Sequence, residues 1–161
     1  MEVNFDIADN HALSFAGRHI DLHNNFDLIN FEYNVAEREI KLHWKKSSGD
    51  WVKEDELSNL VLIHSSVTFL KATEQDEKSI HADDVCLGEI TFFPSTAREI
   101  NDNIIPQSKP NEGDDILYIF ENGMVIRIHC EEIELRYGTP TCYVQSSPNK
   151  KGGRMYTERS D

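Results

Sequence analysis

Apolar and polar residues alternate along most of the chain, and this alternation predicts strands. Ile40, Leu42 and Trp44 are separated by polar residues, which is the period of two typical of a strand with one buried face. By the same pattern we predict strands near 26–33, 38–44, 60–70, 85–93, 115–121 and 124–130. The alternation shifts by one residue at Ile29-Asn30, which indicates a β-bulge or a strand buried on both faces.

The clearest turn signal is Asn122-Gly123, which lies between two apolar runs rich in β-branched and aromatic residues. Both central positions of a type I′ turn require a positive φ, which Asn and Gly tolerate best. We therefore predict a type I′ hairpin here, with the rest of the sheet assembled around it.

Short strands separated by turns about every 8 to 12 residues are typical of an all-β fold, here an antiparallel sandwich or an open barrel. Residues 67–70 are expected either to continue the apolar run 60–63 or to pair with it. At most one short helix is expected, because Thr96 and Glu99 form a capping box that predicts a helical turn to about Asn101. We assign 1–145 to a single β-rich domain and expect 146–161 to be a disordered C-terminal tail.

The charge of the chain changes the range of partners to consider. It has 16 Lys and Arg against 29 Asp and Glu, a net charge of −13, and the tail 146–161 contributes four basic and two acidic residues. Residues 1–145 therefore hold 12 basic and 27 acidic residues, a net charge of −15. Such a charge repels nucleic acid and anionic membranes and attracts a basic protein partner, or it serves only to keep the protein soluble; the oligomeric state stays open.

The location of the protein is expected to be cytoplasmic. The first residues lack the basic and apolar regions of a signal peptide, and no apolar run approaches the roughly 18 residues of a membrane span. Three cysteines without a close pair suit reduced thiols better than disulfides. Cys86 and Cys130 are expected in the core, with His129 outside it.

The segment Asn25–Tyr33, the strand ending at Trp44, and the closing segments Phe120–Gly123 and Ile126–Leu135 resemble small β-rich bacterial proteins of uncharacterised function. Some of those proteins resemble immunity proteins, which neutralise toxins of neighbouring cells. The resemblance implies a partner-binding module and carries over no catalytic residue.

A candidate binding surface surrounds Trp51, which follows a Gly-Asp turn and is expected to be exposed. Asp50, Glu54, Asp55 and Glu56 are close to it in sequence. An aromatic anchor rimmed by carboxylates is the form expected of a surface that binds a basic protein.

His19, Asp21 and His23 suggest a different function. At every second position of a strand they would project from one face about 6 to 7 Å apart and could hold Zn, Fe or Mn, with His43 or His129 as a further ligand. The simpler interpretation is that they form the solvent-exposed face of a strand whose other face is buried.

The leading hypothesis is thus a non-enzymatic, cytosolic protein-binding module, with an immunity-type inhibitor of a basic toxin as its specific form and no cofactor. The alternative is a small metal-dependent β-barrel enzyme that uses His19, Asp21 and His23. A third possibility is a structural subunit of a larger assembly.

Overall fold

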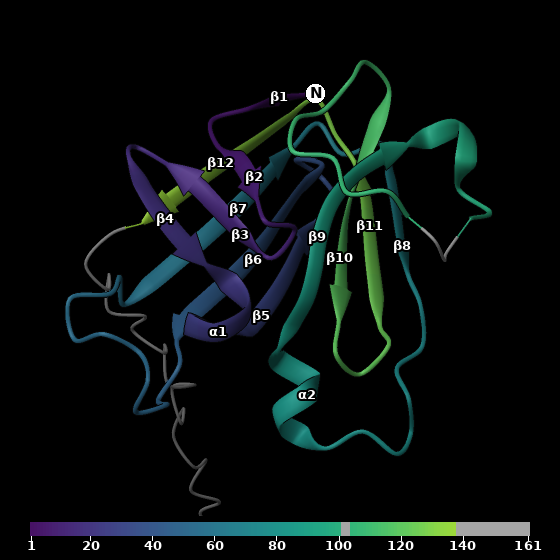
Figure 1. Ribbon diagram of the computed structural model, residues 1–161. Coiled ribbons are helices and arrows are strands. Elements are labelled where there is room, and N and C mark those ends of the chain that lie inside the picture. The colour runs from purple at the N-terminus through teal and green to yellow at the C-terminus, as the bar shows by residue number, and fades with distance from the viewer. Residues whose placement is uncertain (101–103, 138–161) are drawn as a thin grey trace, which may run out of the picture.

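Three sheets make up the computed structural model, which describes residues 1–100 and 104–137 (Figure 1). The five-stranded sheet has the order β1 (Glu2–Val3), β12 (Glu132–Tyr137), β7 (Asn59–Ser65), β6 (Glu39–Lys46) and β5 (Phe26–Asn34). The four-stranded sheet has the order β8 (Phe69–Ala72), β11 (Val125–His129), β10 (Asp114–Phe120) and β9 (Leu87–Pro94). The third consists of β2 (Asp6–Ala8), β3 (Ala12–Phe15) and β4 (Arg18–Asp21). The predicted all-β, antiparallel fold is confirmed.

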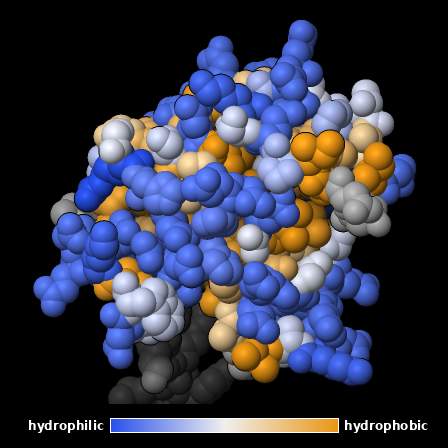
Figure 2. All heavy atoms as spheres, viewed as in Figure 1, coloured by the Kyte–Doolittle hydropathy of each residue, from blue (hydrophilic) through white to orange (hydrophobic). Residues whose placement is uncertain are grey.

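The core lies between the five-stranded and the four-stranded sheet. Ile40, Leu42 and Trp44, the alternating residues of β6, are fully buried. The indole of Trp44 stacks on the ring of Phe120 in β10, with the ring centroids 6.3 Å apart. Burying a large apolar side chain stabilises a fold by about 1.5–3 kcal/mol, so this layer accounts for much of the driving force. The face drawn in Figure 2 is mainly hydrophilic, as the low hydrophobic content predicts.

One pairing in the five-stranded sheet is parallel. β1 runs alongside β12, with Glu2 opposite Glu132. Beyond the end of β1 the side chain of Asn4 continues the pairing, since its Nδ2 donates to the Leu135 carbonyl (3.1 Å) and its Oδ1 accepts from the Leu135 amide (2.8 Å). The first and last described strands are therefore joined at one edge of the sheet.

Five of the six predicted strands are confirmed, with ends that differ by at most two residues. The predicted strand 60–70 is wrong, because the chain leaves the five-stranded sheet after β7 and enters the four-stranded sheet as β8. Ser66 has a left-handed backbone (φ 57°), which turns the chain between the two sheets. Val67 then donates its amide to the Arg38 carbonyl (2.8 Å). Residues 67–70 thus neither extend the run 60–63 nor pair with it.

The central hairpin is confirmed, but its turn is of another type. Gly123 has φ 81°, whereas Asn122 is not left-handed, so the turn is not type I′. The Gly123 amide donates to the Phe120 carbonyl and the Phe120 amide to the Met124 carbonyl (both 2.9 Å), which leaves a three-residue connection. Asn122 is buried, and its Oδ1 accepts from the Met124 amide (2.9 Å). Asn122 therefore stabilises the turn through the hydrogen bond of its side chain and not through a left-handed backbone.

The helices differ from the prediction in number and position. Near the predicted capping box of Thr96 and Glu99 the chain forms only a 3-10 turn, η1 (Ser95–Ala97), without a side-chain cap, and two one-turn helices lie elsewhere, α1 (Leu22–Asn25) and α2 (His81–Val85). α1 forms because the Asp21 side chain accepts a hydrogen bond from the Asn24 amide (2.9 Å). Within the described segments, no helix has the length and apolar character needed to cross a membrane. The predicted tail 146–161 lies outside the described residues.

Candidate functional site

The segment 47–58 joins β6 to β7 and carries the predicted binding surface. Lys46, the last residue of β6, reaches across its base. The Lys46 ammonium donates to the carbonyls of Lys53 (2.6 Å) and Glu54 (3.2 Å). We call this segment the Trp51 loop. The hydrogen bonds of Lys46 hold its middle against the end of β6.

Trp51 is 69% exposed, so its predicted exposure is confirmed. The indole is nevertheless held in place: its Nε1 donates to the carbonyl of Asn24 in α1 (2.8 Å). A Cβ atom on Gly49 would clash with the indole ring, so only glycine allows the ring to lie this close to the backbone. The result is an aromatic side chain that is ordered without being buried.

The acidic residues of the Trp51 loop divide into two kinds. Asp50, Glu54 and Asp55 are exposed. Glu56 is half-buried, and its carboxylate accepts from Asn25 Nδ2 (2.9 Å) and from the Leu57 amide (3.0 Å). The first three therefore belong to the candidate surface together with Trp51, whereas Glu56 ties the loop to the end of α1.

A second exposed feature was missed by sequence reasoning. Four apolar side chains of β5 and the following turn reach solvent: Ile29 (56%), Phe31 (38%), Tyr33 (40%) and Val35 (70%). β5 is the edge of the five-stranded sheet and, in the described part of the chain, pairs with β6 alone. The alternation revealed the strand and the irregularity at Ile29, which the structure confirms as a break in register between Leu28 and Asn30. It could not reveal that the strand would lie at an edge.

The suggested ligands His19, Asp21 and His23 do not share a strand face, so that part of the prediction is wrong. β4 ends at Asp21, whose carboxylate caps α1, and His23 lies within that helix. The His23 ring reaches β9 of the four-stranded sheet, where its Nδ1 donates to the Leu87 carbonyl (2.6 Å). In residues 1–100 and 104–137 no three His, Cys, Asp or Glu side chains are arranged to hold a metal ion such as Zn, Fe or Mn.

The structure instead brings His23 to Cys86 and Glu121. His23 Nδ1 lies 3.7 Å from the Cys86 sulfur and 3.8 Å from a Glu121 oxygen. Cys86 is partly exposed, so its predicted place in the core is wrong. Burial and then the charges of Glu121 and Asp27 raise the pKa of the Cys86 thiol, which favours the unreactive protonated form. Because His23 Nδ1 already donates to Leu87, it cannot act as a base toward this thiol.

Cys130 fits the prediction of a core cysteine. It is buried, and burial raises the pKa of its thiol to about 12. The neighbouring His129 is partly exposed, as predicted, and its Nδ1 lies 2.9 Å from a carboxylate oxygen of Asp115. A depression of about 490 Å³ lies beside His129, and among its described lining residues no buried side-chain nitrogen or oxygen lacks a hydrogen bond.

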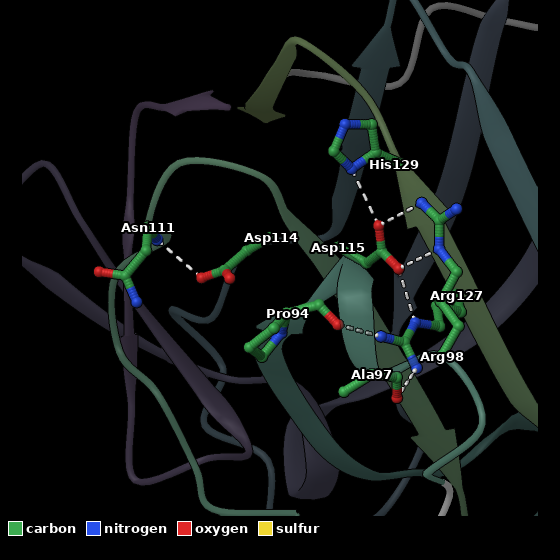
Figure 3. A network of polar contacts seen from close by, with 8 residues as sticks. All are labelled: Pro94, Ala97, Arg98, Asn111, Asp114, Asp115, Arg127 and His129. Carbon is green, nitrogen blue, oxygen red and sulfur yellow. Dashed lines mark hydrogen bonds and ion pairs between the residues drawn. The ribbon is translucent and has the colours of Figure 1, made fainter.

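Asp115 is the centre of a buried polar network (Figure 3). Arg98 donates to both of its oxygens (2.8 Å each), and Arg127 donates from Nε to Oδ2 (2.7 Å). Burial raises the pKa of Asp115, but the hydrogen bonds from the two guanidinium groups outweigh this effect and hold the pKa below its usual value. Sequence reasoning missed this network, although a carboxylate at the start of a buried apolar run was a signal for it.

The network holds a segment of the chain on the outer face of the four-stranded sheet. Arg127 also donates to the carbonyl of Pro94 (2.9 Å), and the guanidinium of Arg98 lies 3.6 Å above the centre of the Phe69 ring. Each charged group is thus engaged within the protein. We therefore interpret the Asp115 network as structural.

Comparison with known proteins adds no assignment to this picture. No family model, curated protein or solved structure matches the chain. Among the described residues, the Trp51 loop and the edge strand β5 are the exposed features on which the proposals below rest.

Proposed function

We propose that the chain is a non-enzymatic binding module for a positively charged protein. The observation that carries this proposal is Trp51, which is 69% exposed and yet held by Asn24 and Gly49. An aromatic side chain that is ordered before binding loses little conformational entropy on binding, and Trp is enriched among residues that dominate binding energy.

The electrostatics of the chain support the same proposal. Asp50, Glu54 and Asp55 are exposed on the same loop as Trp51, and the chain has a net charge of −13. Opposite net charges raise the rate of encounter by about 10- to 10³-fold at low salt. The Trp51 loop thus combines a rigid aromatic anchor with a rim that attracts a basic protein.

An immunity-type inhibitor of a basic toxin in the bacterial cytoplasm is the specific form of this proposal. It rests on the resemblance of residues 25–33 and 120–135 to such proteins and on the acidic character of the chain. In this form the captured partner is a basic enzyme, and one equivalent of the module abolishes its activity.

The test uses a basic protein captured from the source cells, purified and measured by surface binding kinetics at several salt concentrations. Trp51→Ala should raise the dissociation rate about tenfold or more, because a central anchor is lost. Trp51→Phe keeps a ring but loses the hydrogen bond to Asn24, so an intermediate effect is expected.

The acidic rim is tested with a triple variant, Asp50→Asn, Glu54→Gln and Asp55→Asn. It should slow association and flatten its dependence on salt. The matched control removes the same charge from exposed residues outside the loop, Glu74, Glu77 and Glu112, each changed to Gln. Equal effects of the two triple variants, together with an unchanged dissociation rate for Trp51→Ala, would mean that the surface is wrong. Failure to find any protein partner would reject the binding module itself.

A further inference from the structure

β5 is a long edge of the five-stranded sheet, interrupted by one break in register between Leu28 and Asn30. It is nine residues long, and within the described part of the chain its backbone hydrogen bonds go only to β6. The opposite edge, β1, has only two residues. The edge strand β9 of the other sheet is covered, because the Ile90 amide donates to the Asn10 carbonyl (2.7 Å). Proteins usually guard long edges by such means, since exposed backbone groups bind other strands.

The side chains of β5 add an apolar surface to this edge. Phe31 and Tyr33 lie opposite Leu42 and Ile40, so they point to the core side of the sheet, yet more than a third of each is exposed. The other face presents polar residues, among them Glu32. Apolar residues at alternate positions beside unpaired backbone are what an added strand requires: the backbone provides affinity and the side chains provide selectivity.

The charges around the start of β5 identify the kind of strand that fits. Asp27 lies in β5, Asp21 caps α1, Asp83 lies in α2, and Glu121 is at the turn after β10. α1 and α2 both contact β5. His23 Nδ1 lies 3.7 Å from the Cys86 sulfur and 3.8 Å from a Glu121 oxygen, and the charges of all four carboxylates raise the pKa of the Cys86 thiol. A second copy of this chain, itself carrying −13, would be repelled.

We propose that β5 accepts an extended, positively charged segment of the partner protein as an additional strand. This inference rests on the proposed function and specifies how the partner docks. Trp51 lies near the start of β5, because its indole Nε1 donates to the carbonyl of Asn24, two residues before β5 begins. The partner's apolar side chains would pack on Phe31 and Tyr33, and its Lys or Arg side chains would meet the carboxylates.

The first test uses a capped nine-residue peptide of alternating Lys and Val. Hydrogen exchange of the backbone amides should slow at least tenfold within 26–34 on addition of this peptide and not elsewhere. A peptide with Glu in place of Lys, and one with methylated backbone nitrogens along one edge, should each give no protection. Protection outside β5, or equal binding of the methylated peptide, would overturn the inference.

The second test places guarding charges on the edge. The pair Ile29→Lys and Tyr33→Lys should weaken peptide binding at least tenfold. The matched control adds the same two charges at exposed isoleucines elsewhere, Ile80→Lys and Ile105→Lys, which are 64% and 80% exposed in the wild type. Circular dichroism verifies that both variants are folded. Equal weakening by the two pairs would show a general charge effect and overturn the inference.

Further results separate this inference from the function on which it rests. If the basic protein binds the Ile29→Lys, Tyr33→Lys variant normally but not Trp51→Ala, strand addition is wrong and the binding module stands. If no basic protein binds but the peptide protects β5, the edge is a strand acceptor and the assigned partner is wrong. A dimer in sedimentation experiments, with β5 amides protected without peptide, would instead assign the edge to a second copy.

Discussion

Aromatic side chains outside the core are covered on the outer face of the four-stranded sheet but left exposed on the edge strand β5. On the outer face, Phe69 lies beneath the guanidinium of Arg98, which is itself fixed by the buried Asp115. On β5, Phe31 and Tyr33 have no such cover among the described residues and remain 38% and 40% exposed. Both regions contain aromatic side chains on strands outside the centre of the core.

The difference shows what covering such a surface requires. A segment of chain must be held by strong interactions, here two guanidinium groups that share one carboxylate. Buried charges are tolerated only when they are paired and hydrogen-bonded. No comparable device exists at β5 in the described residues, so its apolar side chains are left to contact something other than this part of the chain.

The largest effect is expected from removing the centre of the covered region. Asp115→Ala would leave Arg127 buried without its carboxylate, which should lower the free energy of unfolding by about 3–5 kcal/mol. Urea denaturation measures this change. Asp115→Asn, which retains the shape and one accepting oxygen, should cost less. A loss below about 1 kcal/mol for Asp115→Ala would contradict the role of the network.

Acidification should lower the free energy of unfolding somewhat less than Asp115→Ala does, and the cause is the buried His64. His64 donates from Nδ1 to the Ile40 carbonyl (3.2 Å), so its Nε2 accepts from the Tyr118 hydroxyl (2.8 Å). Burial lowers the pKa of His64 from 6.5 to about 4. As pH falls from 6.5 toward 4, His64 takes up a proton in the unfolded chain but stays neutral in the folded protein. The free energy of unfolding therefore falls by about 3 kcal/mol.

The same experiment separates the core from the Asp115 network. The folded-state pKa of Asp115 is lowered, so its contribution is present above the ordinary Asp value and is lost only as pH falls further. Urea denaturation between pH 7 and pH 4 should thus show the His64 slope first. His64→Gln should flatten that slope; an unchanged slope would assign it to other groups.

A smaller effect is expected at Arg98, which is partly exposed. Arg98→Lys keeps the charge but loses the two parallel hydrogen bonds to Asp115 and the flat contact with Phe69, which should cost about 1–2 kcal/mol. Exchange of the Gln107 amide, which donates to Thr91 Oγ1 (2.9 Å) in the same covered face, should also become faster. Unchanged exchange would mean that the cover is held without Arg98.

The smallest effect is expected on the open edge. Ile29→Thr combined with Val35→Thr should change the free energy of unfolding by less than about 1 kcal/mol, because both side chains are more than half exposed. The control Leu42→Ala removes a fully buried side chain and should cost about 2–5 kcal/mol. A large loss from the Ile29 and Val35 pair would mean that this edge stabilises the fold.

Much of the fold could be predicted because alternation reports burial locally. The strands that contain Ile40–Trp44 and Ile116–Phe120 were found in this way, as was the exposure of Trp51 after a Gly-Asp turn. The order of the strands is not a local property. For that reason the exposed edge of β5 and the change of sheet at Ser66 were missed.

The site was predictable to the same extent. Asp50, Glu54 and Asp55 could be chosen because exposed acidic residues near a turn need no distant partner. Glu56 looked equivalent, but its partner Asn25 lies 31 positions away. The Asp115 network likewise depends on the pairing of β10 with β11 and on the return of Arg98 to the same face.

The side chain of Asn4 has a consequence for stoichiometry. Directly after β1 it forms two hydrogen bonds to the backbone of Leu135, so this edge of the five-stranded sheet has few free backbone groups for another strand. In the language of polymerisation, a sheet with two open margins is bivalent and grows into fibres, whereas a sheet with one open margin is monovalent. This sheet is closest to monovalent, so the strand addition proposed at β5 would end after one added strand and give a discrete complex.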